Sequence, residues 1–128
     1  MKDNTSKKTL SSNIVDLSFL IENFSDDFEQ LALMINMFLG QSQDKVSLLK
    51  GSIQKKDYVT IKATAHFLKS SFTIMGLQSK DLLSEIELLS SQSKEIEKIK
   101  SLTNSIVLNF NESVIEYKKI LKNIQSKT

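Results

Sequence analysis

The stretch that decides the fold runs from residue 61 to residue 77 and reads IKATAHFLKSSFTIMGL. Its apolar residues recur at spacings of four, three, four and three, at Ile61, Ala65, Leu68, Phe72 and Met75. This spacing is typical of an α-helix that buries one side against a protein core. The stretch therefore predicts a helix, with Asp57 as its N-cap and Gly76 as its left-handed C-terminal residue.

His66 is the only histidine of the chain, and it falls one residue out of phase with the apolar stripe. Residues three and four apart are neighbours on a helix surface, so His66 shares its face with Lys62, Lys69, Ser70 and Thr73. The sequence thus predicts an imidazole on the surface of a rigid helix, with an ammonium one turn away. This arrangement suits a nucleophile that must accept an anion.

The composition favours an all-α protein of one domain. The chain has 128 residues, of which 40% are hydrophobic and 25% are charged, as is usual for a globular domain. It contains no proline and only three glycines, so few residues interrupt helices. No alternating pattern of strands bounded by turns is present.

Several classes of function are excluded by the residues that are missing or few. The absence of cysteine excludes disulfides and thiolate chemistry, and one histidine has no second metal ligand at a suitable spacing. All 17 basic residues are lysine and the net charge is only +2, so we expect no nucleic-acid partner. No continuous apolar stretch follows the polar residues 1–12 and none is long enough to span a bilayer, so we expect no signal peptide and a cytoplasmic protein without a membrane partner.

The apolar periodicity predicts five helices. A short helix covers residues 16–23, and the second helix starts at Ser25 or Asp26 and runs to Lys55. Three more helices cover residues 58–75, 79–90 and 94–124. Asp26 and Glu29 have the spacing of a capping box at the start of the second helix. Short links favour antiparallel neighbours, which predicts an up-down four-helix bundle with a short additional N-terminal helix. We expect a monomer, with a disordered tail at residues 1–12 and the bundle domain at residues 13–125.

The stretch from residue 65 to residue 77 resembles the signature of histidine-containing phosphotransfer (HPt) domains. That signature is His-x-Leu-Lys-[Gly/Ser]-Ser with a glycine ten residues after the histidine, and it is matched by His66, Leu68, Lys69, Ser70, Ser71 and Gly76. The resemblance extends over residues 14–122. The family also has Leu-x-x-Leu-Glu in its next helix. The nearest match, at residues 83–87, falls about one residue earlier than the family pattern, so we assign Glu87 no site role.

The resemblance implies an intermediate of a multistep two-component phosphorelay. His66 would be the phosphoacceptor, and Lys69 would stabilise charge on the phosphoryl oxygens. Lys62, Ser70, Thr73 and Gly76 would belong to the surface on which a partner docks. The partners would be receiver domains and a hybrid sensor histidine kinase. The receiver would hold Mg²⁺, so the chain itself would need no cofactor and would be a phosphocarrier rather than an enzyme.

A second class of function stays open at this stage. The chain could be a helical-bundle interaction module that is never phosphorylated, with an incidental His66. The sequence does not identify the upstream kinase, the downstream regulator, the signal or the direction of transfer. It also leaves open whether the domain stands alone or was part of a hybrid kinase.

Overall fold

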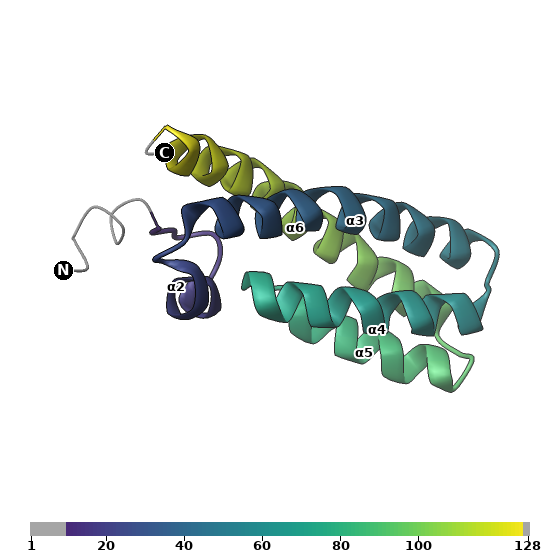
Figure 1. The fold of residues 1–128 in the computed structure, drawn as a ribbon. Helices are drawn as coiled ribbons and strands as arrows, with labels where there is room; N and C mark the ends of the chain where they lie inside the picture. Colours follow the sequence, from purple (N-terminus) through teal and green to yellow (C-terminus); the bar gives the residue numbers. More distant parts are fainter. Residues whose placement is uncertain (1–9, 127–128) are drawn as a thin grey trace.

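A computed structural model describes residues 10–126, and these residues form five helices and no strand (Figure 1). The helices are α2 (Ser18–Phe24), α3 (Phe28–Gln54), α4 (Tyr58–Met75), α5 (Lys80–Ser91) and α6 (Ile96–Gln125). The predicted all-α fold class is confirmed. No helix within residues 10–126 is long and apolar enough to cross a membrane.

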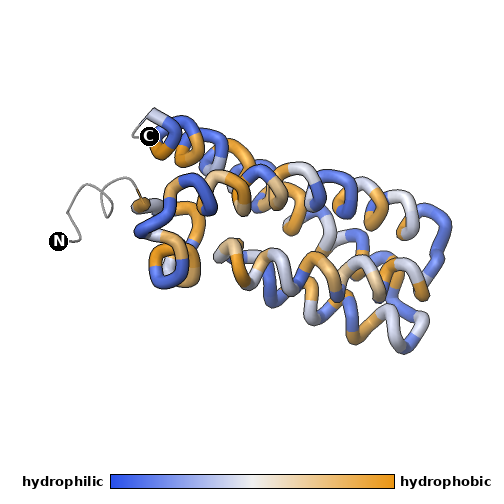
Figure 2. The backbone as a smooth tube through the Cα atoms, in the orientation of Figure 1, coloured by the Kyte–Doolittle hydropathy of each residue, from blue (hydrophilic) through white to orange (hydrophobic). Residues whose placement is uncertain are grey.

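The four long helices form a closed bundle around one core. Helix α3 packs against α4 and α6, and α5 packs against the same two helices. Successive long helices run in opposite directions, and α2 lies at the end of the bundle near the C-terminus (Figure 1). Orange hydrophobic segments and blue hydrophilic segments alternate along each helix, as expected for helices with one buried side (Figure 2).

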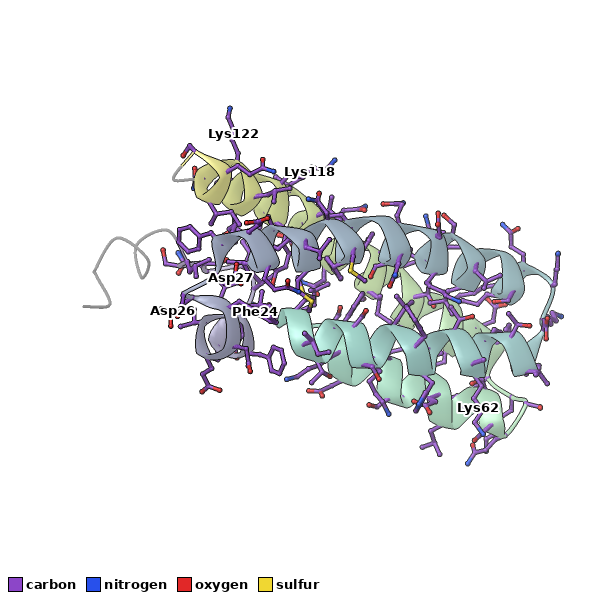
Figure 3. The ribbon with its side chains drawn as sticks, viewed as in Figure 1. Phe24, Asp26, Asp27, Lys62, Lys118 and Lys122 are labelled. Atoms are coloured by element: carbon purple, nitrogen blue, oxygen red, sulfur yellow. The ribbon has the colours of Figure 1, made fainter. Side chains whose placement is uncertain are left out.

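The N-cap of α3 lies one or two residues after the predicted start at Ser25 or Asp26. The N-cap is Asp27 rather than Asp26, because Oδ1 of Asp27 accepts a hydrogen bond of 3.0 Å from the Gln30 backbone N–H. Phe24, Asp26 and Asp27 lie around the sharp turn between α2 and α3 (Figure 3). Asp26 and Asp27 both fit the capping pattern, and the geometry of this turn makes Asp27 the N-cap.

Both predicted ends of α4 are confirmed. Asp57 caps the helix, since its Oδ1 accepts a hydrogen bond of 3.2 Å from the Thr60 N–H. Gly76 ends it in the left-handed region at φ 70°. These two residues fix the register of the helix that carries His66.

A chain segment before α2 is fastened to the end of α4. The Asp16 N–H donates a hydrogen bond of 2.8 Å to the carbonyl of Gly76. Leu10 is buried, and the Ser12 hydroxyl donates to the Glu116 carboxylate on α6. The packed domain therefore begins before residue 13, which is the boundary that we predicted. Residues 1–9 of the predicted tail lie outside the described residues.

The core holds α4 from two sides through an aromatic cluster. Phe72 of α4 stacks on Phe110 of α6 with ring centroids 6.0 Å apart, and Phe38 of α3 meets both rings edge-on. The buried Tyr117 hydroxyl donates a hydrogen bond to the Met75 carbonyl, and burial raises the pKa of this hydroxyl. All five residues of the predicted stripe of α4 are buried. Helix α4 is thus a rigid support for the residues on its outer face.

We predict that Gly76→Ala destabilises the protein strongly. A Cβ at this position would lie 1.8 Å from the Asp16 carbonyl oxygen, and the φ of 70° is unfavourable for alanine. The free energy of unfolding should fall by about 2–4 kcal/mol in chemical denaturation followed by circular dichroism.

Gly40→Ala is the matched control. A Cβ at Gly40 would meet nothing within 4 Å, and Gly40 lies inside α3. This variant should be about 0.5–1 kcal/mol more stable than wild type, because alanine favours helices. Equal stability of the Gly76→Ala variant and the wild type would contradict the close approach of Asp16.

Candidate functional site

His66 lies in the middle of α4, and its side chain is 66% exposed. The exposure follows from its place in the helix, since Ala65 beside it points into the core and is fully buried. The backbone at His66 is held in a helix of 18 residues, so the ring is displayed at a fixed position. The predicted surface position of the histidine is confirmed.

Glu87 of α5 joins His66 and Lys69 into one cluster. Its Oε2 lies 2.9 Å from Nδ1 of His66, and its Oε1 lies 2.9 Å from Nζ of Lys69. The Glu87 side chain is only 19% exposed, because α5 packs along α4. One carboxylate from the neighbouring helix therefore holds both side chains that the sequence singled out.

The charge on Glu87 determines which ring nitrogen of His66 is free. The neighbouring Lys69 ammonium lowers the pKa of Glu87, and the bond from His66 lowers it further, against the opposing effect of partial burial. An ionised carboxylate only accepts hydrogen bonds, so Nδ1 of His66 is the donor. In the neutral ring the lone pair then lies on Nε2. The cluster makes Nε2 the nucleophilic nitrogen of His66.

Lys69 is placed to neutralise a second anion near the ring. Its side chain is 35% exposed, and its ammonium is within ion-pair distance of a carboxylate that also contacts His66. A long and flexible lysine side chain can turn its ammonium toward an anion on the ring without moving the helix. Lys69 and Glu87 thus surround the imidazole with one charge of each sign.

Three of the other predicted site residues lie on the exposed side of α4. Lys62, Ser70 and Thr73 are all exposed, and Figure 3 places Lys62 toward the end of the bundle that lies away from α2. The Thr73 hydroxyl donates a hydrogen bond of 2.8 Å to the Lys69 carbonyl. Ser70 has a short side chain one turn from His66, whose own side chain stays largely exposed.

Gly76 does not belong to this surface. It is buried beneath the backbone of Asp16, so the prediction that it contacts a docking partner is wrong. Its conformation ends α4 and admits the N-terminal segment, which is a structural role.

Glu87 is the residue that the sequence analysis missed. The pattern Leu83-x-x-Ile86-Glu87 was a usable signal, because Leu83 and Ile86 are buried and place Glu87 beside α4. This match falls about one residue earlier than the family pattern, and the sequence alone does not fix the register between two helices.

Within residues 10–126, no group of three or more histidine, cysteine, aspartate or glutamate side chains is arranged to hold a metal ion. The described cluster contains one histidine and one carboxylate, and their facing atoms bind each other.

Comparison with known proteins supports the fold. No protein-family model and no curated protein sequence matches the chain. A crystal structure of histidine-containing phosphotransfer protein B from Pseudomonas aeruginosa PAO1 is similar, with a TM-score of 0.79 and 18% sequence identity. The match covers 88% of this chain and 97% of the other. The chain has the fold of an HPt domain, as the sequence resemblance predicted.

We predict that the single histidine is held as the Nδ1–H tautomer. In ¹⁵N-labelled protein above neutral pH, long-range ¹H–¹⁵N spectra should show a protonated Nδ1 and an unprotonated Nε2. Glu87→Ala should shift the ring toward the Nε2–H tautomer that free histidine favours, because the acceptor for Nδ1 is gone.

Glu85→Ala is a matched control, since Glu85 on the same helix pairs with Lys98 instead. It should leave the tautomer of His66 unchanged. An unprotonated Nδ1 in the wild type would contradict the proposed orientation of the ring.

Proposed function

We propose that this protein is a phosphorelay intermediate that carries a phosphoryl group on His66. It would accept the group from an aspartyl phosphate of one receiver domain and pass it to the aspartate of another. The observation that carries the proposal is the contact of Glu87 with Nδ1 of His66 on an exposed and rigid helix. This contact leaves Nε2 as the nucleophile at the surface.

In the transfer step one bond to phosphorus forms and another breaks. The lone pair of Nε2 attacks phosphorus, a nitrogen–phosphorus bond forms, and the bond between phosphorus and the aspartate oxygen breaks. The electron pair of that bond leaves with the aspartate, which becomes a carboxylate. The proton stays on Nδ1, so the phosphorylated ring is cationic, and the Glu87 carboxylate at 2.9 Å stabilises its charge.

Lys69 would stabilise the transferred group. The phosphoryl oxygens carry negative charge throughout the step, and an ammonium acts on them as a point charge. In the resting protein the Lys69 ammonium forms an ion pair with the Glu87 carboxylate. We propose that Lys69 turns toward the phosphoryl group while Glu87 keeps its contact with Nδ1 of His66. Lys69 then stabilises the phosphoryl oxygens, and Glu87 stabilises the cationic ring.

The chain acts as a carrier and its partner supplies the remaining machinery. The cluster contains no free acid–base pair beside His66, since its carboxylate is already engaged by His66 and Lys69. In this proposal the receiver domain holds the Mg²⁺ and the aspartate. A hybrid sensor histidine kinase would lie upstream, and the carrier would act as a monomer in the cytoplasm. The fold shared with the Pseudomonas phosphotransfer protein supports the same role.

The experiment that tests the proposal is transfer from a phosphorylated receiver domain in the presence of Mg²⁺. The wild type should acquire a label that is acid-labile and alkali-stable, as expected for phosphohistidine. His66→Gln should acquire none, yet should keep its helix content because the side chain is largely exposed. Lys69→Ala should lower the transfer rate by about tenfold or more, since one stabilising charge is lost.

Lys118→Ala serves as the matched control, since Lys118 is an exposed lysine of α6 outside both the Glu87 cluster and the predicted docking surface. Its transfer rate should fall much less than that of Lys69→Ala. A folded wild type that takes no label from several receivers would contradict the proposal. It would favour an interaction module in which His66 has no chemical role.

A further inference from the structure

A pocket of about 380 Å³ opens between the end of α3 and the first third of α6, at the end of the bundle that lies away from α2 (Figure 1). Both helices line it, with Lys50, Ile53, Gln54, Lys100, Thr103 and Asn104. Its volume is typical of small-molecule pockets, which enclose about 300–1,000 Å³. Helices α4 and α5 hold the cluster of His66, Lys69 and Glu87, so this pocket is separate from the proposed phosphotransfer site.

The floor of this pocket is apolar. Ile53 and Thr103 are each only 4% exposed, so they form the floor and not the rim. The Thr103 hydroxyl donates a hydrogen bond of 2.8 Å to the Ile99 carbonyl, so its proton is not available to a ligand. Removing an apolar group from water onto such a floor favours association. The floor therefore suits the apolar body of a ligand.

The rim of the pocket is positively charged. Lys50 of α3 and Lys100 of α6 line it from the two helices, and both are exposed. Within residues 10–126, Lys50 has no carboxylate at ion-pair distance. Lys100 pairs with Glu97 at 3.2 Å, but the Glu97 side chain is 82% exposed, and surface pairs of this kind are weak. The two ammonium groups therefore favour a ligand that carries an anionic group.

The extent of the pocket fits a small molecule rather than a protein segment. Its lining covers about one turn of each helix, from Lys50 to Gln54 and from Lys100 to Asn104, which is roughly 6 Å of helix length. A docked protein partner would bury a much larger surface. Gln54 and Asn104 are exposed, and their amide groups can donate hydrogen bonds to the oxygens of an anionic group.

We propose that the pocket between α3 and α6 binds a small amphipathic anion, a free molecule with an apolar body and one carboxylate or similar group. The apolar body covers Ile53, and the anionic group lies between the ammonium groups of Lys50 and Lys100. The ligand joins α3 to α6 and stabilises the bundle, because it binds the folded protein alone. This site goes beyond the proposed phosphotransfer function and does not depend on it.

The test uses two fluorescent probes, anilinonaphthalene sulfonate, which has an apolar body and one sulfonate, and its uncharged analogue phenylnaphthylamine. The wild type should bind the sulfonate probe at a single site, and decanoate should displace it. In the double variant Lys50→Met and Lys100→Met, the dissociation constant of the sulfonate probe should rise about fivefold or more, since two charges are lost. The dissociation constant of the uncharged probe should change by less than about twofold, because methionine keeps an apolar side chain at both positions.

Lys45→Met is the matched control. Lys45 lies on the same helix as Lys50, but its ammonium is 4.9 Å from the centre of the Phe67 ring of α4, on the side of α3 that is turned toward α4. This variant should bind both probes as the wild type does. Circular dichroism checks that all variants fold, which is expected because Lys50 and Lys100 are exposed.

Three results would overturn the proposal. In the first, the double variant binds the sulfonate probe as tightly as the wild type does, or the wild type does not bind it. In the second, Lys45→Met weakens the binding of the sulfonate probe as much as the double variant does, which would place the probe between α3 and α4. In the third, decanoate fails to displace the probe, which would exclude the proposed class of ligand.

Discussion

The carboxylate of Glu87 is the group on which the site depends. It binds Nδ1 of His66 with one oxygen and the ammonium of Lys69 with the other, each at 2.9 Å. Without it, the imidazole on an exposed helix would rotate freely and would present either nitrogen to a partner. With it, Nδ1 is engaged, the lone pair of the neutral ring lies on Nε2, and the ammonium of Lys69 is kept close by. The chemistry of the site is therefore set by a contact between two helices.

The rest of the fold keeps these two helices in register. The aromatic rings of Phe38, Phe72 and Phe110 hold the buried side of α4 against α3 and α6. At its C-terminus α4 is held a second time, because Gly76 allows the backbone of Asp16 to lie directly against it. Burial and backbone contact thus fix the scaffold, while the face of α4 that carries His66 stays exposed.

The sequence predicted most of the fold because the decisive signals are local. The stripe from Ile61 to Met75, the Asp57 cap and the Gly76 terminus each depend on residues within a few turns, and all three are confirmed. The choice between Asp26 and Asp27 was missed because it depends on the turn from α2. Glu87 and the buried position of Gly76 were missed for a similar reason, since both depend on segments far away in the sequence. The site residues on α4 were predictable from the sequence, whereas the contact with Glu87 of α5 was not.

The most direct test of this account is the position of the phosphoryl group on His66. The protein would be phosphorylated by a receiver domain, and the phosphohistidine isomer would be identified by ³¹P and ¹⁵N nuclear magnetic resonance under alkaline conditions. Because Glu87 engages Nδ1, the account predicts a phosphoryl group on Nε2 alone. A phosphoryl group on Nδ1 would contradict it, since that nitrogen could not then donate to Glu87.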